Sequence, residues 1–206
     1  MGLDGERTWL EIVIATLLEG GCRPVVVVLG ASAVAARAAV RMNRLPPDRE
    51  HGAPAVLWVV NDSWPDGRAG SLQCGLRTLP PETTGVVIHA VDHPDVRPET
   101  VAALVAAHAQ TSPGVPIGRT PGSREAISGS VFLPVHRGRR GHPVLVARAV
   151  WPEILALAPD DSLRTVVHRD PARRRDVEVD DPGILHNRNE RESGDAAPAA
   201  HPQKGA

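Results

Sequence analysis

The chain has 206 residues, 42% of them hydrophobic, and a formal net charge of −1 at pH 7, so charge gives no reason to expect a nucleic acid or an acidic membrane as a partner. Phenylalanine occurs once and tyrosine not at all, so we expect a core of Val, Leu, Ile and Ala. No apolar run is long enough to span a bilayer, no signal peptide is evident, and the two cysteines lack metal-ligand spacing. These features predict a cytoplasmic protein without a membrane partner.

The first half of the chain alternates apolar segments with helical patterns. We predict, in order, a helix over Thr8–Glu19, a strand over Pro24–Gly30, a helix over Ser32–Asn43 and a strand over Val56–Val60. This βαβ rhythm is typical of parallel strands covered by helices.

A glycine-rich segment, Gly67–Leu76, follows the second strand. Its glycines free the backbone, and Ser71 is expected to open a helix, which favours a pocket for an anion or a base. An ordinary glycine-rich turn with Ser71 as its N-cap fits the same residues. The segment is neither a Walker loop nor a Gly-x-Gly-x-x-Gly motif.

The next apolar run, Val86–Val91, predicts a buried strand that ends at Asp92, His93 and Pro94. In an open parallel sheet, ligands collect beyond the carboxyl ends of the strands. Asp92 is therefore placed to hold a divalent cation against a nucleotide phosphate. The alternative is that Asp92 only caps the following turn.

In the second half we predict a helix over Arg97–Gln110, a strand over Gly129–Val135, a helix over Ala147–Ala158 and a short strand over Asp176–Val179. Between them, three arginines stand among glycines next to His142, an arrangement suited to phosphates or another anionic substrate. A solvated basic hairpin is the alternative. The histidines of the chain do not form a zinc motif.

Four ordered patterns resemble one family of enzymes. They are Asn61-x-x-Trp64-x-x-Gly67 with Ser71-Leu72 and Gly75-Leu76; Val91-Asp92-His93-Pro94; Gly138-Arg139-Arg140-Gly141-His142-Pro143; and Asp161-x-Leu163-Arg164. The closing Asp180-Asp181-Pro182-Gly183 fits as well. Together they are similar to the molybdenum cofactor cytidylyltransferase and guanylyltransferase family of nucleotidyltransferases. The resemblance predicts one domain over residues 1–192, and the Ala-, Pro- and Gly-rich residues 193–206 predict a disordered tail.

The resemblance implies a Rossmann-like nucleotidyltransferase fold: three α/β layers, with a mostly parallel sheet and helices on both faces. It implies that Mg²⁺ and CTP or GTP meet a molybdopterin-type phosphorylated acceptor, and that pyrophosphate leaves. A molybdoenzyme or its chaperone would be the protein partner. The family's functional positions carry over to Asp92 for catalysis, to Asp92 and Asn189 for the metal, and to Gly70, Ser71, Leu72, Arg140, Gly141, His142 and Pro143 for substrate binding.

Two departures from the family pattern limit these expectations. The family opens with a strand and the loop Leu-Ala-Ala-Gly-x-Ser-x-Arg-Met-Gly-x-x-Lys, whereas Met1–Thr8 matches only the region after that loop, and the sole lysine is Lys204. The second metal position carries the neutral Asn189. We therefore expect an N-terminally truncated fold with impaired nucleotidyl transfer. The alternatives are an inactive binding or regulatory module and a sugar- or polyol-phosphate nucleotidyltransferase.

Overall fold

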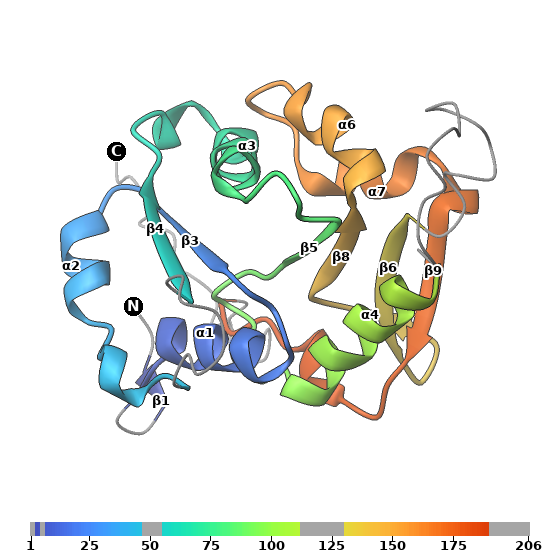
Figure 1. Ribbon diagram of the computed structural model, residues 1–206, viewed down its shortest axis with the longest axis horizontal. Coiled ribbons are helices and arrows are strands. Elements are labelled where there is room, and N and C mark those ends of the chain that lie inside the picture. Colours follow the sequence, from blue (N-terminus) through green and yellow to red (C-terminus); the bar gives the residue numbers. More distant parts are fainter. Residues whose placement is uncertain (1–2, 5–6, 47–54, 112–129, 190–206) are drawn as a thin grey trace, which may run out of the picture.

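The computed structural model describes residues 3–4, 7–46, 55–111 and 130–189. The predicted α/β class is confirmed, with strands in a row and helices on both sides of them (Figure 1). Helices α1 (Trp9–Glu19) and α4 (Pro98–Thr111) lie on one side, and α3 (Arg68–Thr78) and α6 (Trp151–Leu155) lie on the other. The tail predicted for residues 193–206 lies outside the described residues.

The N-terminal region is a short antiparallel pair, β1 (Leu3–Asp4) and β2 (Arg7–Thr8), followed at once by α1. Thr8 and Glu11 begin α1 with a capping box, in which each side chain accepts a hydrogen bond from the other residue's backbone N–H. The predicted helix over Thr8–Glu19 therefore begins one residue later, with Thr8 as its N-cap.

Two parallel strands, β3 (Val25–Leu29) and β4 (Val56–Val60), pair in register from Val25 with Val56 to Leu29 with Val60. Both match the predicted strands. The helix between them, α2 (Ala33–Ala38), is shorter than predicted, and a 3₁₀ turn over Met42–Arg44 follows it.

A second sheet contains β5 (Gly85–Ile88), β6 (Val131–His136), β7 (Arg139–Arg140), β8 (Val144–Ala147) and β9 (Arg174–Glu178). Its order is β5-β8-β6-β7, with β9 also paired to β6. The pairs β5–β8, β8–β6 and β6–β7 are antiparallel, and β6–β9 is parallel.

The prediction of a mostly parallel sheet is therefore wrong, because the described strands form a mixed arrangement. For one of the antiparallel pairs the cause is the connection between β6 and β7, which consists of Arg137 and Gly138 alone. A two-residue connection joins antiparallel neighbours, whereas parallel neighbours need a long crossover. The strand predicted to reach Val91 ends at Ile88, since Ala90–His93 forms a turn closed by a hydrogen bond from His93 N to Ala90 O.

The remaining helices are short. The helix predicted over Ala147–Ala158 is split, with Ala147 ending β8, a 3₁₀ turn over Arg148–Val150, and α6 confined to Trp151–Leu155. Helix α7 (Leu163–Arg169) follows, and 3₁₀ turns over Pro171–Arg173 and Pro182–Leu185 flank β9. Among the described helices, none combines the length and the apolar character that a membrane crossing requires.

Among the described residues three apolar clusters pack against the strands, and the third of them is small. The first joins α1 residues to β3 and also includes Val101 of α4, with Val87 of β5 packed against it. The second joins Ala69 and Leu76 of α3 to β6, β8, α6 and α7, with β5 residues packed against it. The first cluster therefore bridges two sheets that do not pair with each other among the described strands.

Candidate functional site

The loop after β5 places Asp92 beside the end of the described chain. Oδ2 of Asp92 accepts a hydrogen bond from Nδ2 of Asn189 at 3.2 Å, and the Asp92 carbonyl oxygen accepts one from Arg188 N at 2.8 Å. Its other carboxylate oxygen, Oδ1, is buried without a hydrogen-bond partner. The structure therefore brings together the two residues that the sequence assigned to a metal, and leaves one oxygen of the pair unsatisfied.

Histidines surround this carboxylate. Nε2 of His93 lies 3.9 Å from Oδ1 of Asp92, and the rings of His93 and His142 lie 4.5 Å apart between centroids. Burial lowers the pKa of His142, and burial lowers the pKa of His89 to about 4. At neutral pH His89 and His142 are therefore uncharged, and they do not neutralise Asp92.

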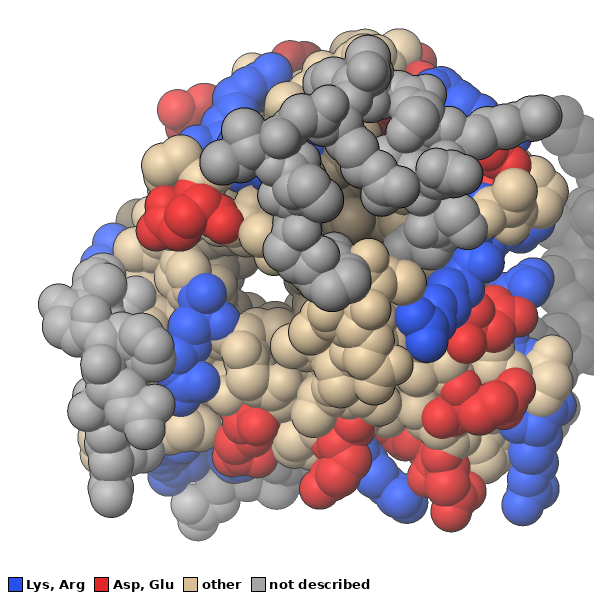
Figure 2. All heavy atoms as spheres, turned by 45° about the vertical axis from the view of Figure 1, so that its right-hand side comes forward, with Lys and Arg blue, Asp and Glu red and all other residues tan. Residues whose placement is uncertain are grey.

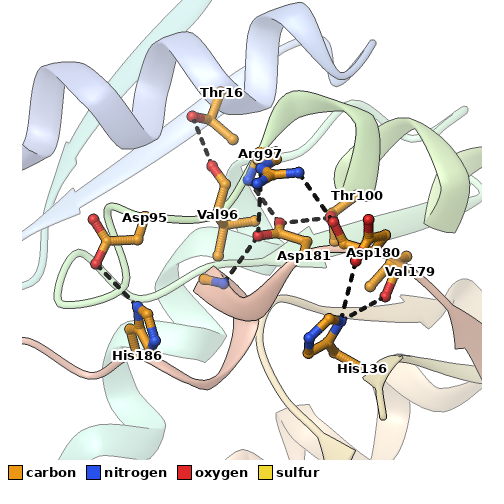
Figure 3. A network of polar contacts seen from close by, with 11 residues as sticks. Thr16, Asp95, Val96, Arg97, Thr100, His136, Val179, Asp180, Asp181 and His186 are labelled. Atoms are coloured by element: carbon orange, nitrogen blue, oxygen red, sulfur yellow. Dashed lines mark hydrogen bonds and ion pairs between the residues drawn. The ribbon is translucent and has the colours of Figure 1, made fainter.

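The buried carboxylate of Asp181 holds the end of the loop after β5, where that loop joins α4 (Figure 3). Its Oδ2 accepts hydrogen bonds from Arg97 N at 2.8 Å and from Thr100 Oγ1 at 2.7 Å, while its Oδ1 accepts one from Gly183 N at 2.9 Å. A Cβ at Gly183 would lie 2.1 Å from the carbonyl oxygen of Asp95, so only glycine allows this approach. Asp181 thus caps the first turn of α4 and a 3₁₀ turn at once.

A second tie lies nearer to Asp92. Two nitrogens of Arg188, Nε and Nη2, donate to the two carboxylate oxygens of Asp95, and Nδ1 of His186 lies 3.6 Å from Oδ2 of Asp95. The hydrogen bonds from Arg188 hold the pKa of the Asp95 carboxyl below its usual range. The family pattern included Asp181 but gave it no role, and the sequence analysis did not single out Asp95. In the structure these two carboxylates hold the segment that carries Asn189 against the loop after β5.

A cavity of about 590 Å³ lies next to this loop. Ser71 and Leu72 of α3, Arg68 at the start of that helix, and His89 and His142 all line it. Apolar residues of β3 and β5 also line this cavity. The cavity therefore has a mixed lining, in which polar residues that include His89 and His142 join apolar residues of strands from both sheets.

Ser71 is oriented by a neighbouring amide. Asn61 Nδ2 donates to Ser71 Oγ at 3.1 Å, while Asn61 Oδ1 accepts from Ser63 N at 3.2 Å. A Cβ at Gly70 would lie 3.4 Å from Asn61 Nδ2, so Gly70 packs directly against this amide. Ser71 does not open the helix as expected, because α3 already begins at Arg68, and Ser71 lies in its first turn with its side chain facing Asn61.

The Gly-Arg-Arg-Gly-His-Pro run divides between two places. Arg139 and Arg140 are exposed on the β6–β7 hairpin, and Arg140 makes two hydrogen bonds, of 2.7 and 2.8 Å, to Asp176 on β9. A Cβ at Gly141 would lie 2.2 Å from the carbonyl oxygen of Ile184, so Gly141 allows the 3₁₀ turn at 182–185 to pack here. Pro143 is buried at the start of β8.

Of this run, His142 alone lines the cavity. The roles in substrate binding stay predictions for all seven residues: Gly70, Ser71, Leu72, Arg140, Gly141, His142 and Pro143. Two of the guanidinium nitrogens of Arg140 are held by Asp176, which fixes its orientation toward any ligand.

The fit to a divalent metal can be judged from Asp92 and Asn189. The described residues contain no group of three or more His, Cys, Asp or Glu side chains that could enclose a metal. Magnesium that is bound mainly by substrate phosphates and water needs only one or two protein oxygens. The unpartnered Oδ1 of Asp92, with the Asn189 amide beside it, meets that smaller requirement.

Comparisons with known proteins agree with the fold. The family model of the MobA-like NTP transferase domain matches residues 2–176. Nicotine blue oxidoreductase from Paenarthrobacter nicotinovorans is 28% identical over 158 residues, which are 76% of this chain and 65% of that protein. The matched region therefore spans less than two thirds of that relative.

Solved structures from mycobacteria are similar as well. The crystal structure of Rv0371c from Mycobacterium tuberculosis H37Rv has 21% identity and a TM-score of 0.62 over 87% of this chain and 80% of that one. The Rv0371C complex with manganese has 21% identity and a TM-score of 0.57, covering 82% of this chain and 76% of that one. A homologue from Mycobacterium sp. strain JC1 has 20% identity and a TM-score of 0.58, covering 86% and 76%. At these identities the likeness concerns the fold.

Proposed function

The chain belongs to the MobA-like NTP transferase family, and on that basis we propose that it is a nucleotidyltransferase whose reaction centre lies at Asp92. The finer assignment that we propose is transfer of CMP or GMP from CTP or GTP to a molybdopterin-type phosphorylated acceptor. An acceptor phosphate oxygen forms a bond to the α-phosphorus of the nucleotide. The bond from that phosphorus to the bridging oxygen breaks, and pyrophosphate leaves with the electron pair.

The observation that carries this proposal is the buried, unpartnered Oδ1 of Asp92 next to Asn189. Asp92 lies in the loop whose residues His89 and Ala90 line the cavity. Asp92 and Asn189 would hold a divalent ion, which supplies charge neutralisation for the phosphates when it is bound. The manganese in the Rv0371C complex is consistent with such an ion. An amide that rotates by half a turn presents its oxygen in place of its NH₂ group, so Asn189 can serve as a neutral ligand.

The chain's own residues have three further tasks in this proposal. Ser71, fixed by Asn61, and the exposed Arg68 lie where they can contact the nucleotide. The neutral His142 lines the cavity without repelling the ion. The ties from Asp181 and Asp95 keep the loop and Asn189 in place before substrate arrives, and such preorganisation lowers the barrier in phosphoryl transfer.

We propose that transfer is slow in the chain as given, because a triphosphate of roughly four negative charges is held in such sites by backbone amides, a basic residue and the metal together. The sole lysine of the sequence is Lys204, and Arg140 is engaged by Asp176. A catalytically inactive binding module is the second candidate, favoured by this same shortage of positive charge. We also propose that the strands and helices form a three-layer arrangement.

The test is calorimetric titration of CTP and GTP with and without Mg²⁺, together with a pyrophosphate-release assay that includes molybdopterin. We expect Mg²⁺-dependent binding of one nucleotide and slow release of pyrophosphate, both lost in Asp92→Asn. Glu82→Gln removes an exposed carboxylate that does not line the cavity and serves as the matched control. Nucleotide binding without release would select the inactive module, and binding that is unchanged in Asp92→Asn would overturn the site.

A further inference from the structure

An imidazole lies beside the unpartnered oxygen of Asp92. Nε2 of His93 is 3.9 Å from Oδ1 of Asp92, which is longer than a hydrogen bond between nitrogen and oxygen. Oδ1 is buried and has no hydrogen-bond partner, and the side chain of His93 is only 8% exposed. A carboxylate oxygen and an imidazole nitrogen therefore lie close together, away from bulk solvent, without bonding to each other.

The local structure fixes the position of the His93 ring. His93 N donates to Ala90 O at 3.3 Å, which closes the turn after β5, and the next residue is Pro94. The His93 ring packs against the ring of His142, with 4.5 Å between the centroids and 37° between the planes. The second ring nitrogen, Nδ1, is buried and has no hydrogen-bond partner, so nothing at Nδ1 forces the proton onto Nε2. Nε2 can therefore present its lone pair to a cation.

The separation of these two atoms fits one metal ion bound by both. Imidazole nitrogens and carboxylate oxygens bind a divalent ion such as zinc at about 2.0–2.2 Å. Two ligand atoms of one ion are therefore about 3 Å apart when they lie at right angles, and at most about 4.4 Å apart when they lie on opposite sides. The 3.9 Å between Oδ1 of Asp92 and Nε2 of His93 falls inside this range.

Proximity of a histidine to an aspartate is not by itself evidence of a metal site. His136 provides the comparison, because its Nδ1 lies 3.8 Å from Oδ1 of Asp180. That nitrogen donates to Val179 O at 3.1 Å, and the Asp180 side chain is 99% exposed, so water satisfies its oxygens. Oδ1 of Asp92 has neither a protein partner nor access to water, and an unpartnered buried carboxylate oxygen is costly. A cation in contact with that oxygen removes the cost.

We propose that Nε2 of His93 is a ligand of the divalent ion held by Asp92, and that this nitrogen makes the site prefer first-row transition ions to Mg²⁺. Mg²⁺ takes oxygen ligands, whereas imidazole suits transition ions and binds them more strongly from Mn²⁺ to Co²⁺ and Ni²⁺. The inference rests on the ion position at Asp92 in the proposed function, and adds a ligand that this function does not require. Two protein side chains leave the other positions of the ion to substrate phosphates and water.

Surface charge offers no equivalent selection. In the face shown in Figure 2, acidic side chains are interspersed with basic ones and form no continuous acidic patch. Attraction by surface carboxylates would also treat divalent ions alike, because it depends on their charge and not on their preference for nitrogen. A difference in affinity between two ions of the same charge therefore reports the ligands themselves.

The first test is calorimetric titration of Mg²⁺, Mn²⁺ and Co²⁺ into the chain without nucleotide. We expect the parent to bind Co²⁺ at least about tenfold more tightly than Mg²⁺. His93→Gln should lower the affinity for Co²⁺ at least about tenfold, since loss of even an outer-shell partner of a metal costs about 10–100-fold. Its affinity for Mg²⁺ should change by less than about threefold, because Mg²⁺ gains little from a nitrogen ligand.

The second test reads the ligand directly. Pulsed electron paramagnetic resonance of the Mn²⁺-loaded parent should show the nitrogen coupling of a directly bound imidazole, and His93→Gln should lose it. This signal depends on coordination and does not require activity. Its absence in the parent would overturn the proposal even if the variant failed to fold.

His136→Gln is the matched control, because it removes a histidine that is 8% exposed, against 7% for His93, and that also lies near an aspartate. It should keep both the Co²⁺ affinity and the nitrogen coupling of the parent. Equal losses in the two variants would overturn the proposal. Loss of Co²⁺ binding in Asp92→Asn with no change in His93→Gln would overturn the nitrogen ligand alone and keep the ion at Asp92. Unchanged Co²⁺ binding in Asp92→Asn would overturn the ion position itself, and with it the site of the proposed function.

Discussion

Asn189 donates a hydrogen bond from its side-chain amide to Oδ2 of Asp92 at 3.2 Å, although 97 positions separate the two residues in the sequence. The contact forms because the last described segment crosses the loop after β5, where Arg188 N donates to Asp92 O and the Arg188 side chain binds Asp95. A carboxylate and an amide thus meet in the loop whose residues His89 and Ala90 line the cavity.

The first prediction concerns this pair. Asn189→Asp should raise the affinity for Mn²⁺ by about tenfold, because a second carboxylate adds charge to the ligand set. Without metal the two carboxylates repel each other, so the melting temperature of this variant should rise on addition of Mg²⁺ more than that of the parent. Electron paramagnetic resonance titration with Mn²⁺ and thermal melting with and without EDTA measure both effects.

Asn187→Asp is the matched control for that variant. Asn187 Oδ1 accepts a hydrogen bond from Asn189 N, a role that aspartate can keep while it adds the same charge two positions away. An equal gain in Mn²⁺ affinity in both variants would mean that general electrostatic attraction, not ligation at residue 189, causes the change.

The second prediction concerns the buried Asp181. Asp181→Ala removes the acceptor for Arg97 N, Thr100 Oγ1 and Gly183 N, and should lower the free energy of unfolding by about 2–4 kcal/mol. Urea denaturation at pH 8 measures the loss. Asp180→Ala is the control, since the Asp180 side chain is 99% exposed, and it should change stability by less than about 0.5 kcal/mol. Similar losses in the two variants would contradict the capping role.

The sequence predicted the local elements of the first half well. The strands Val25–Leu29 and Val56–Val60 agree with the structure, because short valine-rich runs bounded by glycine, proline or asparagine admit few alternatives. The family assignment is confirmed by the match over residues 2–176. Antiparallel pairing in the second sheet was missed, because local patterns do not state which strand lies next to which.

The site was only partly visible in the sequence. Asp92 follows an apolar strand and precedes a proline turn, which is a local signal. The ties from Asp95 to Arg188 and from Asp181 to Thr100 join positions 93 and 81 residues apart, and no periodicity reports such contacts. The division of the Gly-Arg-Arg-Gly-His-Pro run, with Arg140 paired to Asp176 and His142 at the cavity, likewise depends on the position of β9.

The third prediction separates two roles for Arg140. Its ion pair with Asp176 is exposed on both sides, so Arg140→Ala should cost at most about 1 kcal/mol of stability by urea denaturation. If Arg140 also binds the acceptor, Asp176→Asn should strengthen acceptor binding by freeing the guanidinium, while Arg140→Ala should weaken it. Calorimetric titration of the acceptor with each variant distinguishes the two roles, and no change in either variant would leave Arg140 as a hairpin contact only.

The last prediction concerns pH. Burial lowers the pKa of His89 to about 4, whereas an unfolded histidine titrates near 6.5. Between these values the unfolded chain binds the proton and the folded chain does not, so stability is full above about pH 6.5 and falls as the pH falls toward 4. At about 1.4 kcal/mol per pH unit, the loss from His89 alone is about 2 kcal/mol between pH 6.5 and 5. Burial also lowers the pKa of His142, which adds to the loss in the same direction.

Urea denaturation at intervals from pH 7.5 to 5.0 tests this dependence. The parent should lose stability steadily below about pH 6.5, and His89→Gln should flatten that slope because glutamine fills similar space without a titrating group. His168→Gln removes an exposed histidine of α7 and should keep the slope of the parent. The attribution fails if His89→Gln retains the full slope, because the acid sensitivity would then come from other groups. One such group is the Asp95 carboxylate. Its pKa is lowered in the folded chain, so the stability that it contributes is lost at a more acidic pH.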